Sequence, residues 1–123
     1  MNDKRGPYDW LKVDSDDPDE NVLNLVRTLS LFYKVIFLSG RSAEARVKTK
    51  DWLDIYYGQE YEMLLMRGSG DFRKDNIIKE EIYRNHIKGK YYIEAVFDDR
   101  DQVVNMWREQ LGLKCLQVEP GNF

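Results

Sequence analysis

The chain has 123 residues, a length that suits one domain with its own hydrophobic core. Apolar residues make up 42% and charged residues 33%, which excludes an intrinsically disordered chain. The net charge of −3 excludes binding of nucleic acid over the whole surface, so any site for a polyanion must be local. No apolar stretch reaches membrane-spanning length and the polar start is no signal peptide, so we expect no membrane contact and a cytoplasmic location.

Short apolar strands alternate with amphipathic helices along the chain. The run Asp17-Pro18-Asp19-Glu20 predicts a helix start with Asp17 as the N-cap, and helical spacing of apolar residues continues to about residue 33. The elements expected after it are strands over 35–38, 61–66, 93–97 and 114–118, and helices over 43–57, 75–87 and 102–111. Parallel strands need crossover helices, so this alternation predicts an α/β fold: a three-layer, Rossmann-like parallel sheet with helices on both faces.

The same spacing predicts which side chains are buried. The expected buried positions are Val47, Trp52, Leu53 and Tyr56 in the second helix, Ile78 and Ile82 in the third, and Val103, Trp107 and Leu111 in the fourth. The single cysteine, Cys115, excludes an internal disulfide and is expected to be a buried structural thiol. The single histidine, His86, has no partners at zinc-binding spacing and is expected at the surface or as a cap.

The most informative feature is a strand that ends in two adjacent carboxylates, Asp98 and Asp99. In an open parallel sheet, residues after the strands meet at the carboxyl edge, where such folds bind ligands. Two carboxylates held together repel each other, and a hard cation such as Mg²⁺ relieves that repulsion. The alternative is that Asp99 only caps the following helix.

Other polar residues are expected at the same edge. Ser39 and Arg41 follow the first apolar strand, Arg67 follows the second, and Arg100 follows the carboxylate pair. Lys79, on the intervening helix, could reach over this edge. A hydroxyl donor, several cations and a metal carboxylate are the groups that phosphoryl transfer needs. The alternatives are that Ser39 belongs to an ordinary turn and that Lys79 is a solvated helix residue paired with a nearby glutamate.

Four motifs in chain order resemble the haloacid dehalogenase (HAD) superfamily, and more closely the 3′-phosphatase domain of phage-type polynucleotide kinase-phosphatase. They are Arg5-Gly6-Pro7-Tyr8-Asp9, then Ser39-Gly40-Arg41, then Gly70-Asp71-Phe72-Arg73-Lys74-Asp75 with Lys79-Glu80-Glu81-Ile82, and finally Asp98-Asp99-Arg100-Asp101-Gln102-Val103-Val104. Residues 117–123 also resemble the carboxyl end of that domain. The resemblance therefore covers essentially the whole chain as one domain over residues 1–123.

The resemblance implies Mg²⁺-dependent removal of phosphate from the 3′ end of DNA or RNA through an aspartyl-phosphate. Ser39 is implied to hydrogen-bond the phosphoryl oxygens and Lys79 to neutralise their charge. Asp99 is implied to ligate Mg²⁺, with Asp98 beside it orienting the metal shell. Arg5, Arg41, Arg67 and Arg100 are implied to grip the phosphate or the nucleic-acid end, because guanidinium groups match phosphate geometry.

The chain departs from the family at the first motif. The family's Asp-x-Asp-Gly-Thr, which follows a central strand and carries the nucleophile and general acid, does not occur in the 123 residues. We therefore expect an N-terminally truncated domain that lacks its central strand, leaves two strand edges unpaired and hydrolyses no 3′-phosphate alone. A missing N-terminal segment or a partner chain would supply that strand, or the sheet would close over the gap. No Gly-x-x-x-x-Gly-Lys-Ser/Thr loop occurs either, so we expect no kinase domain.

Three other functions fit parts of the pattern. A non-catalytic or split domain would keep the phosphate and Mg²⁺ contacts and only bind phosphorylated nucleic-acid ends. A signalling receiver combines an acidic pair, a hydroxyl and a lysine, but in a different chain order. A small-molecule phosphatase of the same superfamily would act on nucleotides.

Overall fold

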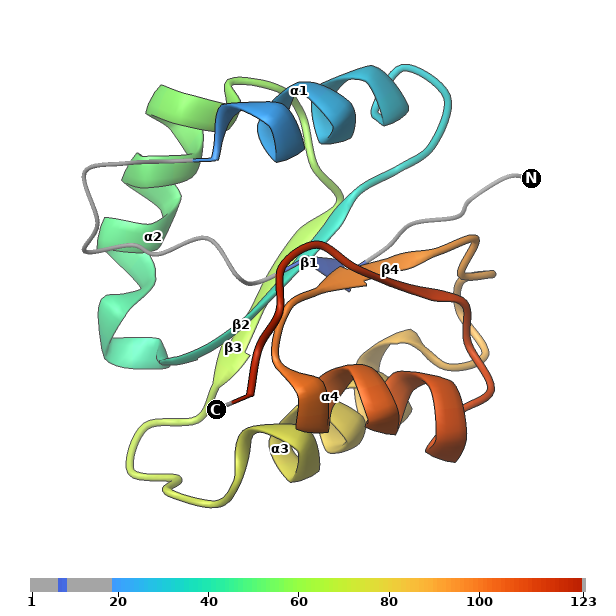
Figure 1. The fold of residues 1–123 in the computed structure, drawn as a ribbon. Helices are drawn as coiled ribbons and strands as arrows, with labels where there is room; N and C mark the ends of the chain where they lie inside the picture. The colour runs from blue at the N-terminus through green and yellow to red at the C-terminus, as the bar shows by residue number, and fades with distance from the viewer. Residues whose placement is uncertain (1–6, 9–18, 123) are drawn as a thin grey trace.

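Five parallel strands form one sheet in the computed structural model, which describes residues 7–8 and 19–122 (Figure 1). The strand order is β3-β2-β1-β4-β5, and each neighbouring pair is parallel. The strands are β1 (Pro7–Tyr8), β2 (Ile36–Ser42), β3 (Met63–Arg67), β4 (Val96–Asp98) and β5 (Cys115–Gln117). The parallel sheet predicted from the sequence is confirmed.

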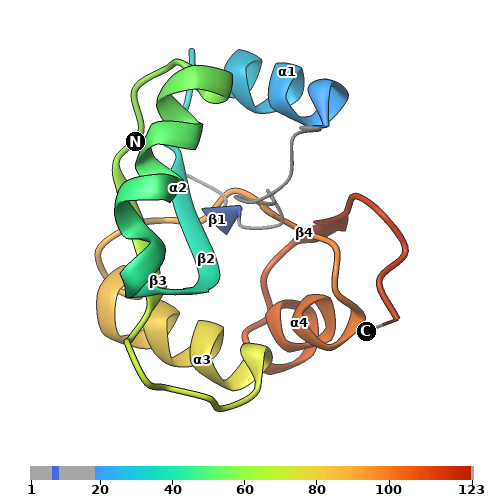
Figure 2. The same cartoon turned by 90° about the vertical axis from the view of Figure 1, so that its left-hand side faces the viewer.

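Four helices cover the two faces of this sheet. Helices α1 (Glu20–Leu29) and α2 (Arg46–Trp52) lie on one face, and α3 (Asp75–Ile82) and α4 (Asp101–Asn105) lie on the other (Figures 1 and 2). A 3₁₀ turn, Ala43–Ala45, precedes α2, and π-helical turns continue α2, α3 and α4 over Leu53–Tyr57, Tyr83–Ile87 and Met106–Gln110. The expected three layers are confirmed. None of the described helices combines the length and apolarity needed to cross a membrane.

The start of α1 differs from the expectation. Asp19 is the N-cap, because its Oδ1 accepts a hydrogen bond from the backbone N–H of Val22 at 3.2 Å. The helix therefore begins at Glu20, and the prediction of Asp17 as the N-cap was wrong. Asp17 itself lies outside the described residues.

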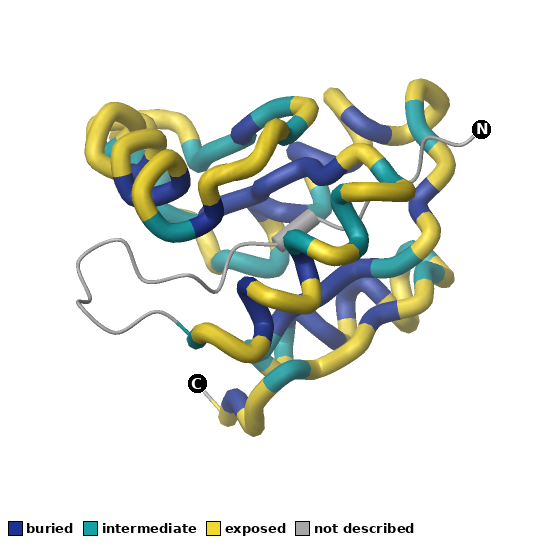
Figure 3. The backbone as a smooth tube through the Cα atoms, turned by 90° about the horizontal axis from the view of Figure 1, so that it is seen from above, coloured by how far each residue is buried: buried dark blue, intermediate teal, exposed yellow. Residues whose placement is uncertain are grey.

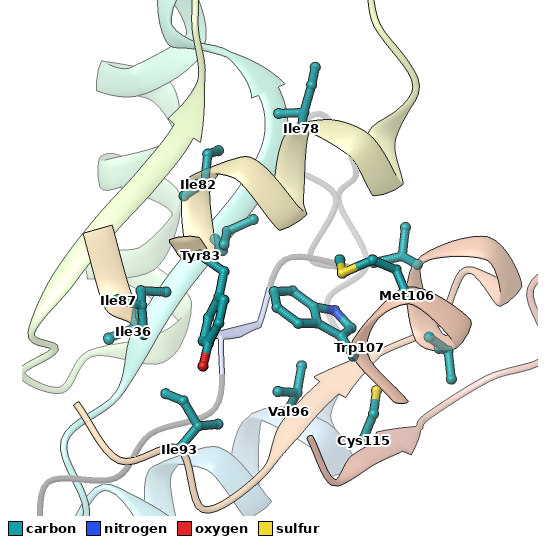
Figure 4. Close-up of a cluster of buried hydrophobic side chains, with 13 residues drawn as sticks. Ile36, Ile78, Ile82, Tyr83, Ile87, Ile93, Val96, Met106, Trp107 and Cys115 are labelled. Atoms are coloured by element: carbon teal, nitrogen blue, oxygen red, sulfur yellow. The ribbon is translucent and has the colours of Figure 1, made fainter. Parts of the chain in front are cut away.

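The two faces of the sheet carry two separate apolar clusters. Ile36 and Leu38 of β2 pack with α3 and α4, whereas Phe37 between them packs with α1 and α2, as the two-residue period of a strand requires. Figure 4 shows the α3–α4 cluster, in which the rings of Tyr83 and Trp107 pack edge to face with their centroids 6.0 Å apart. Figure 3 shows the buried backbone running through the middle of the molecule.

Most expected core positions are buried, with one clear exception. Val47 is 73% exposed, and Thr49 and Tyr57 lie buried on the inner face of that helix. The assignment of Val47 to the core was wrong, because Val47 lies about 200° around the helix axis from the buried Thr49. Tyr56 and Leu111 are only partly buried. The remaining expected core residues are buried, namely Trp52, Leu53, Ile78, Ile82, Val103, Trp107 and Cys115, and His86 is exposed as expected.

The centre of the sheet is occupied by a two-residue strand. Pro7 and Tyr8 pair with Ile36 and Phe37 of β2, and Tyr8 also pairs with Phe97 of β4. The two strand edges that we expected to lack a partner therefore meet β1 instead, which corrects the expectation of an empty central position. Such edges carry backbone N–H and C=O groups that need partners, and a short extended segment supplies some of them.

Candidate functional site

The carboxyl ends of β2, β3 and β4 lie at one edge of the sheet, because the three strands are parallel. Ser39, Arg67 and Asp98 lie at or near the ends of these strands. Helix α3 begins at the same edge with Asp75, and Lys79 follows one turn later. Ion pairs link Arg67, Asp75, Lys79 and Asp98, so this edge is the candidate site.

A bulge in β2 shapes one side of this site. Ser39 pairs with Met66, but the next paired residue is Ser42 with Arg67, so Gly40 and Arg41 stand out of the ladder. Two side chains bind backbone groups of these two residues. The Ser39 Oγ accepts a hydrogen bond from the Arg41 N–H at 3.1 Å, and Arg67 Nε donates to the Gly40 carbonyl at 2.7 Å. The Ser39 hydroxyl still carries a hydrogen that it can donate to a phosphoryl oxygen.

Lys79 is the central cation of the site and is almost fully buried, with 2% of its surface exposed. Its Nζ lies 3.2 Å from Asp75 Oδ2 and 3.4 Å from Asp98 Oδ2. Burial lowers the pKa of the Lys79 ammonium below its usual range, while the Asp98 carboxylate opposes that shift. Two carboxylates at this distance compensate for the loss of water around the ammonium.

Asp98 is held from three directions. Its Oδ2 accepts hydrogen bonds from Lys79 Nζ and from the Trp107 indole N–H at 3.2 Å, and its Oδ1 accepts one from the Asp99 N–H at 2.8 Å. Trp107 lies in the π-helical turn that continues α4, and its ring is buried in the α3–α4 cluster. The hydrophobic core therefore positions this carboxylate. Asp98 therefore acts as a counter-ion and as an anchor for the Asp99 backbone.

Asp75 is a site residue that the sequence analysis missed. Its carboxylate lies between three cations: Lys79 at 3.2 Å, Arg67 at 3.3 Å and Arg100 at 3.7 Å. Burial raises the pKa of the Asp75 carboxyl, the Arg100 and Arg67 guanidinium groups oppose this, and the Asp98 charge adds to it. A signal was present in the sequence, because Asp75 precedes Lys79 by four residues on a helix, the spacing of an ion pair.

Arg67 uses its guanidinium group within the protein. Besides Gly40, it donates to the carbonyls of Asp71 at 2.9 Å and Arg73 at 2.8 Å, and to Asp75 Oδ1 at 3.3 Å. These bonds engage four of the five N–H donors of an arginine. Arg67 therefore holds the bulge in β2, the loop after β3 and the start of α3 in one arrangement.

Asp99 is the carboxylate of this group that best fits a metal. Burial raises the pKa of the Asp99 carboxyl, and the neighbouring Asp98 charge adds to that shift. A divalent cation beside Asp99 would stabilise the ionised form of its carboxyl group. Asp75 and Asp98 already contact the Lys79 ammonium. Residues 7–8 and 19–122 contain no group of three or more His, Cys, Asp or Glu side chains that could hold a metal. The arrangement fits Mg²⁺ that keeps most of its water, since Mg²⁺ often uses only one or two protein carboxylates.

The structure thus brings most of the expected site residues to one edge. Lys79, Asp98 and Asp99 are in direct contact or adjacent, Arg67 and Arg100 join them through Asp75, and Ser39 and Arg41 flank the Gly40 carbonyl that Arg67 binds. Arg5, expected as a phosphate-binding residue, lies outside the described residues.

Gly40 offers a test of how tightly this network is packed. A Cβ atom at Gly40 would overlap Oδ1 of Asp75, whose carboxylate is held by Arg67 at Oδ1 and by Lys79 and Arg100 at Oδ2. We expect Gly40→Ala to lower the free energy of unfolding by about 1–3 kcal/mol in urea denaturation, because the carboxylate must move away from its partners. Gly68→Ala is the matched control, since a Cβ there meets nothing within 4 Å. Equal stability of the two variants would show that Asp75 is not fixed against the bulge.

Comparison with known proteins agrees with this geometry. The family model for the phosphatase domain of polynucleotide kinase PNKP matches residues 1–123. A putative bifunctional polynucleotide kinase/RNA ligase of Autographa californica nuclear polyhedrosis virus is 36% identical over 108 residues, which are 85% of this chain and 16% of the viral protein.

Solved structures give the same result. A chain in a Pnkp1/Rnl/Hen1 complex is 36% identical with a TM-score of 0.88, covering 98% of this chain and 47% of that one. A chain in a structure of the Pnkp1/Rnl/Hen1 RNA repair complex is 37% identical with a TM-score of 0.87, covering 98% and 44%. The chain thus spans less than half the length of each of these relatives. It has the HAD-like α/β fold and belongs to the family of polynucleotide kinase PNKP phosphatase domains.

Proposed function

We propose that this chain is the phosphate-binding part of a Mg²⁺-dependent polynucleotide 3′-phosphatase. The observation that carries the proposal is the Lys79 ammonium, held between Asp75 and Asp98 at the edge where Ser39, Arg41 and Arg100 also lie. Phosphoryl transfer is catalysed mainly by positive charge and donors that are already in place when charge develops. A lysine fixed by two carboxylates is such a group.

Each residue then has a separate task. Ser39 donates its hydroxyl hydrogen to a phosphoryl oxygen, and Lys79 neutralises the charge of the phosphoryl group. Arg41 and Arg100, both partly exposed, bind the phosphate or the strand that carries it. Arg67 acts mainly by holding the surrounding loops, because four of its donors are already bound. Arg5 keeps its proposed role in substrate binding from the family resemblance.

Asp99 would hold Mg²⁺. Asp98 would orient the residue that holds the metal, because its Oδ1 accepts a hydrogen bond from the Asp99 N–H. When bound, Mg²⁺ would offset the negative charge that gathers on the phosphoryl oxygens.

The nucleophile is proposed to come from outside these 123 residues. They contain no Asp-x-Asp-Gly-Thr motif, and the chain matches only 16% of the viral relative. A further segment of the same polypeptide or a partner chain would supply the motif. The relatives' names, which include an RNA ligase and an RNA repair complex, favour an RNA 3′ end and protein partners. The alternative is a split or non-catalytic domain that only binds phosphorylated ends.

The first prediction from this proposed function is that this chain binds 3′-phosphorylated ends without hydrolysing them. In fluorescence anisotropy, it should bind a 3′-phosphorylated oligonucleotide more tightly than the same oligonucleotide with a 3′-hydroxyl. Arg41→Ala should reduce that preference by about ten- to one-hundred-fold, because hydrogen bonds between charged groups are worth roughly 1.5–3 kcal/mol. Arg84→Ala, which removes an exposed arginine paired with Glu80 on α3, should leave it unchanged.

Phosphate release should be measured on the same oligonucleotide with Mg²⁺. We expect no release above the background rate. Release by the purified chain would refute the proposal that the nucleophile lies elsewhere, and equal affinity for both oligonucleotides would refute the phosphate-binding site.

A second prediction concerns Mg²⁺ and the pKa of Asp99. The folded-state pKa is raised, so the stability linked to the Asp99 proton is present below the unfolded pKa and is lost as the pH rises through the folded pKa. At neutral pH an ionised Asp99 therefore destabilises the metal-free protein. Asp99→Asn should be at least as stable as the unaltered chain without Mg²⁺, and should lose the rise in Tm that Mg²⁺ produces.

Asp101→Asn is the matched control for this measurement. Asp101 is an exposed carboxylate two residues away whose Oδ1 accepts a hydrogen bond from Gln117, and an asparagine oxygen can accept it too. The control should keep the Mg²⁺-dependent rise in Tm. An undiminished rise in Asp99→Asn would remove Asp99 from the metal site.

A further inference from the structure

Phe72 is the most exposed large apolar side chain in the described residues, at 92% of its surface. It lies in the loop of residues 68–74 that leads from β3 to α3, at the lower left of Figure 1. A single exposed apolar residue is ordinary on a protein surface. Phe72 differs because the backbone on both sides of it is held in place.

Two arginines fix that backbone. Arg67 Nη1 donates to the carbonyls of Asp71 and Arg73, the two residues that flank Phe72. The Arg73 guanidinium in turn lies 2.7 Å from carboxylate oxygens of both Asp71 and Glu81, which ties the loop to α3. The same contact with Arg73 holds the pKa of Asp71 at about 2, so the pair stays charged near neutral pH. The aromatic ring is therefore presented to solvent from a fixed position.

This loop is part of the candidate site. Arg67, which holds it, also contacts the Gly40 carbonyl and Asp75. A second tether crosses to the segment after β2, where the Ser69 hydroxyl donates to Glu44 Oε2 at 3.1 Å. The loop that carries Phe72 is thus linked to Lys79 through Arg67 and Asp75.

An open hollow of about 400 Å³ adjoins this tether. Its lining residues are Arg41, Ser42, Glu44, Ala45 and Lys48, so it shares Glu44 with the loop and carries two cationic side chains. Proteins that bind single-stranded nucleic acid combine a cationic groove for the backbone with an aromatic ring on which a base stacks. The hollow and the loop that carries Phe72 are joined by the Ser69–Glu44 hydrogen bond, and Arg41 of the hollow belongs to the proposed phosphate site.

The other large exposed aromatic side chains of the described residues lie elsewhere. Phe32 and Tyr92 are 74% and 73% exposed. Phe32 lies between α1 and β2, and Tyr92 precedes β4, so both lie before the amino ends of strands, away from the carboxyl edge.

We propose that the Phe72 ring stacks on a base next to the 3′ end, while the hollow at Arg41 and Lys48 takes the adjoining sugar–phosphate backbone. This inference rests on the proposed function, because it assumes that a nucleic-acid 3′ end enters the site. It adds that the domain recognises a base-bearing strand and not phosphate alone.

The test uses two 3′-phosphorylated oligonucleotides, one complete and one whose last nucleotides lack their bases. We expect Phe72→Ala to weaken binding of the complete oligonucleotide by about five- to one-hundred-fold, the range for loss of one stacked base. It should not change binding of the abasic one. Phe72→Trp should keep the affinity for the complete oligonucleotide, because a larger aromatic ring still stacks. Phe32→Ala is the matched control and should change neither affinity.

Two outcomes would overturn the inference while the proposed function stands. Unchanged affinity of Phe72→Ala for the complete oligonucleotide would show that the ring does not stack on a base. Equal weakening for both oligonucleotides would indicate a disturbed loop. If the unaltered chain shows no preference for a 3′-phosphate over a 3′-hydroxyl, the proposed function fails and the inference fails with it.

Discussion

Lys79 can carry a charge inside this fold because Asp75 and Asp98 lie within 3.4 Å of its ammonium. A buried charge without such partners would cost several kcal/mol. The three residues come from the first turns of α3 and from the end of β4, so the sheet and the helix must meet in one register. Trp107 extends the same constraint into the core through its hydrogen bond to Asp98.

Arg67 carries this constraint to the loops around the site. It joins the Gly40 carbonyl, the loop after β3 and Asp75, and so couples the bulge that carries Ser39 and Arg41 to the helix that carries Lys79. If this edge binds phosphate as proposed, it needs little rearrangement when the anion arrives, which is the condition for electrostatic catalysis. The hydrogen bonds from Arg67 to the carbonyls of Asp71 and Arg73 also fix the backbone on both sides of the exposed Phe72.

The sequence predicted the layers and most elements. Apolar residues recur at helical spacing in segments such as 75–87, and the buried strands are short apolar runs. Chain order and strand ends also predicted that Ser39, Lys79, Asp98 and Asp99 would converge, since parallel strands share a carboxyl edge. Asp75 was not predicted because it lies at the start of helix α3, whereas the topology of a parallel sheet points only to residues at strand ends. The four acceptors of Arg67 could not be predicted, because three of them are backbone carbonyls whose positions depend on the folded loops. Val47 was wrongly assigned to the core, because the exposed face of a helix also carries single apolar residues.

A double-mutant cycle on Lys79 and Asp98 tests the central claim most directly. Lys79→Met removes the charge, and Asp98→Asn removes the counter-charge while keeping one oxygen, which can accept from either the Trp107 or the Asp99 N–H group. Each single variant should lower the free energy of unfolding by about 3–5 kcal/mol, because it removes one member of the buried Lys79–Asp98 ion pair and leaves the other member with fewer partners. The double variant should cost less than the sum of the two by more than about 1 kcal/mol. If the two costs instead add to within about 0.5 kcal/mol, the buried pair is not the interaction on which the site depends.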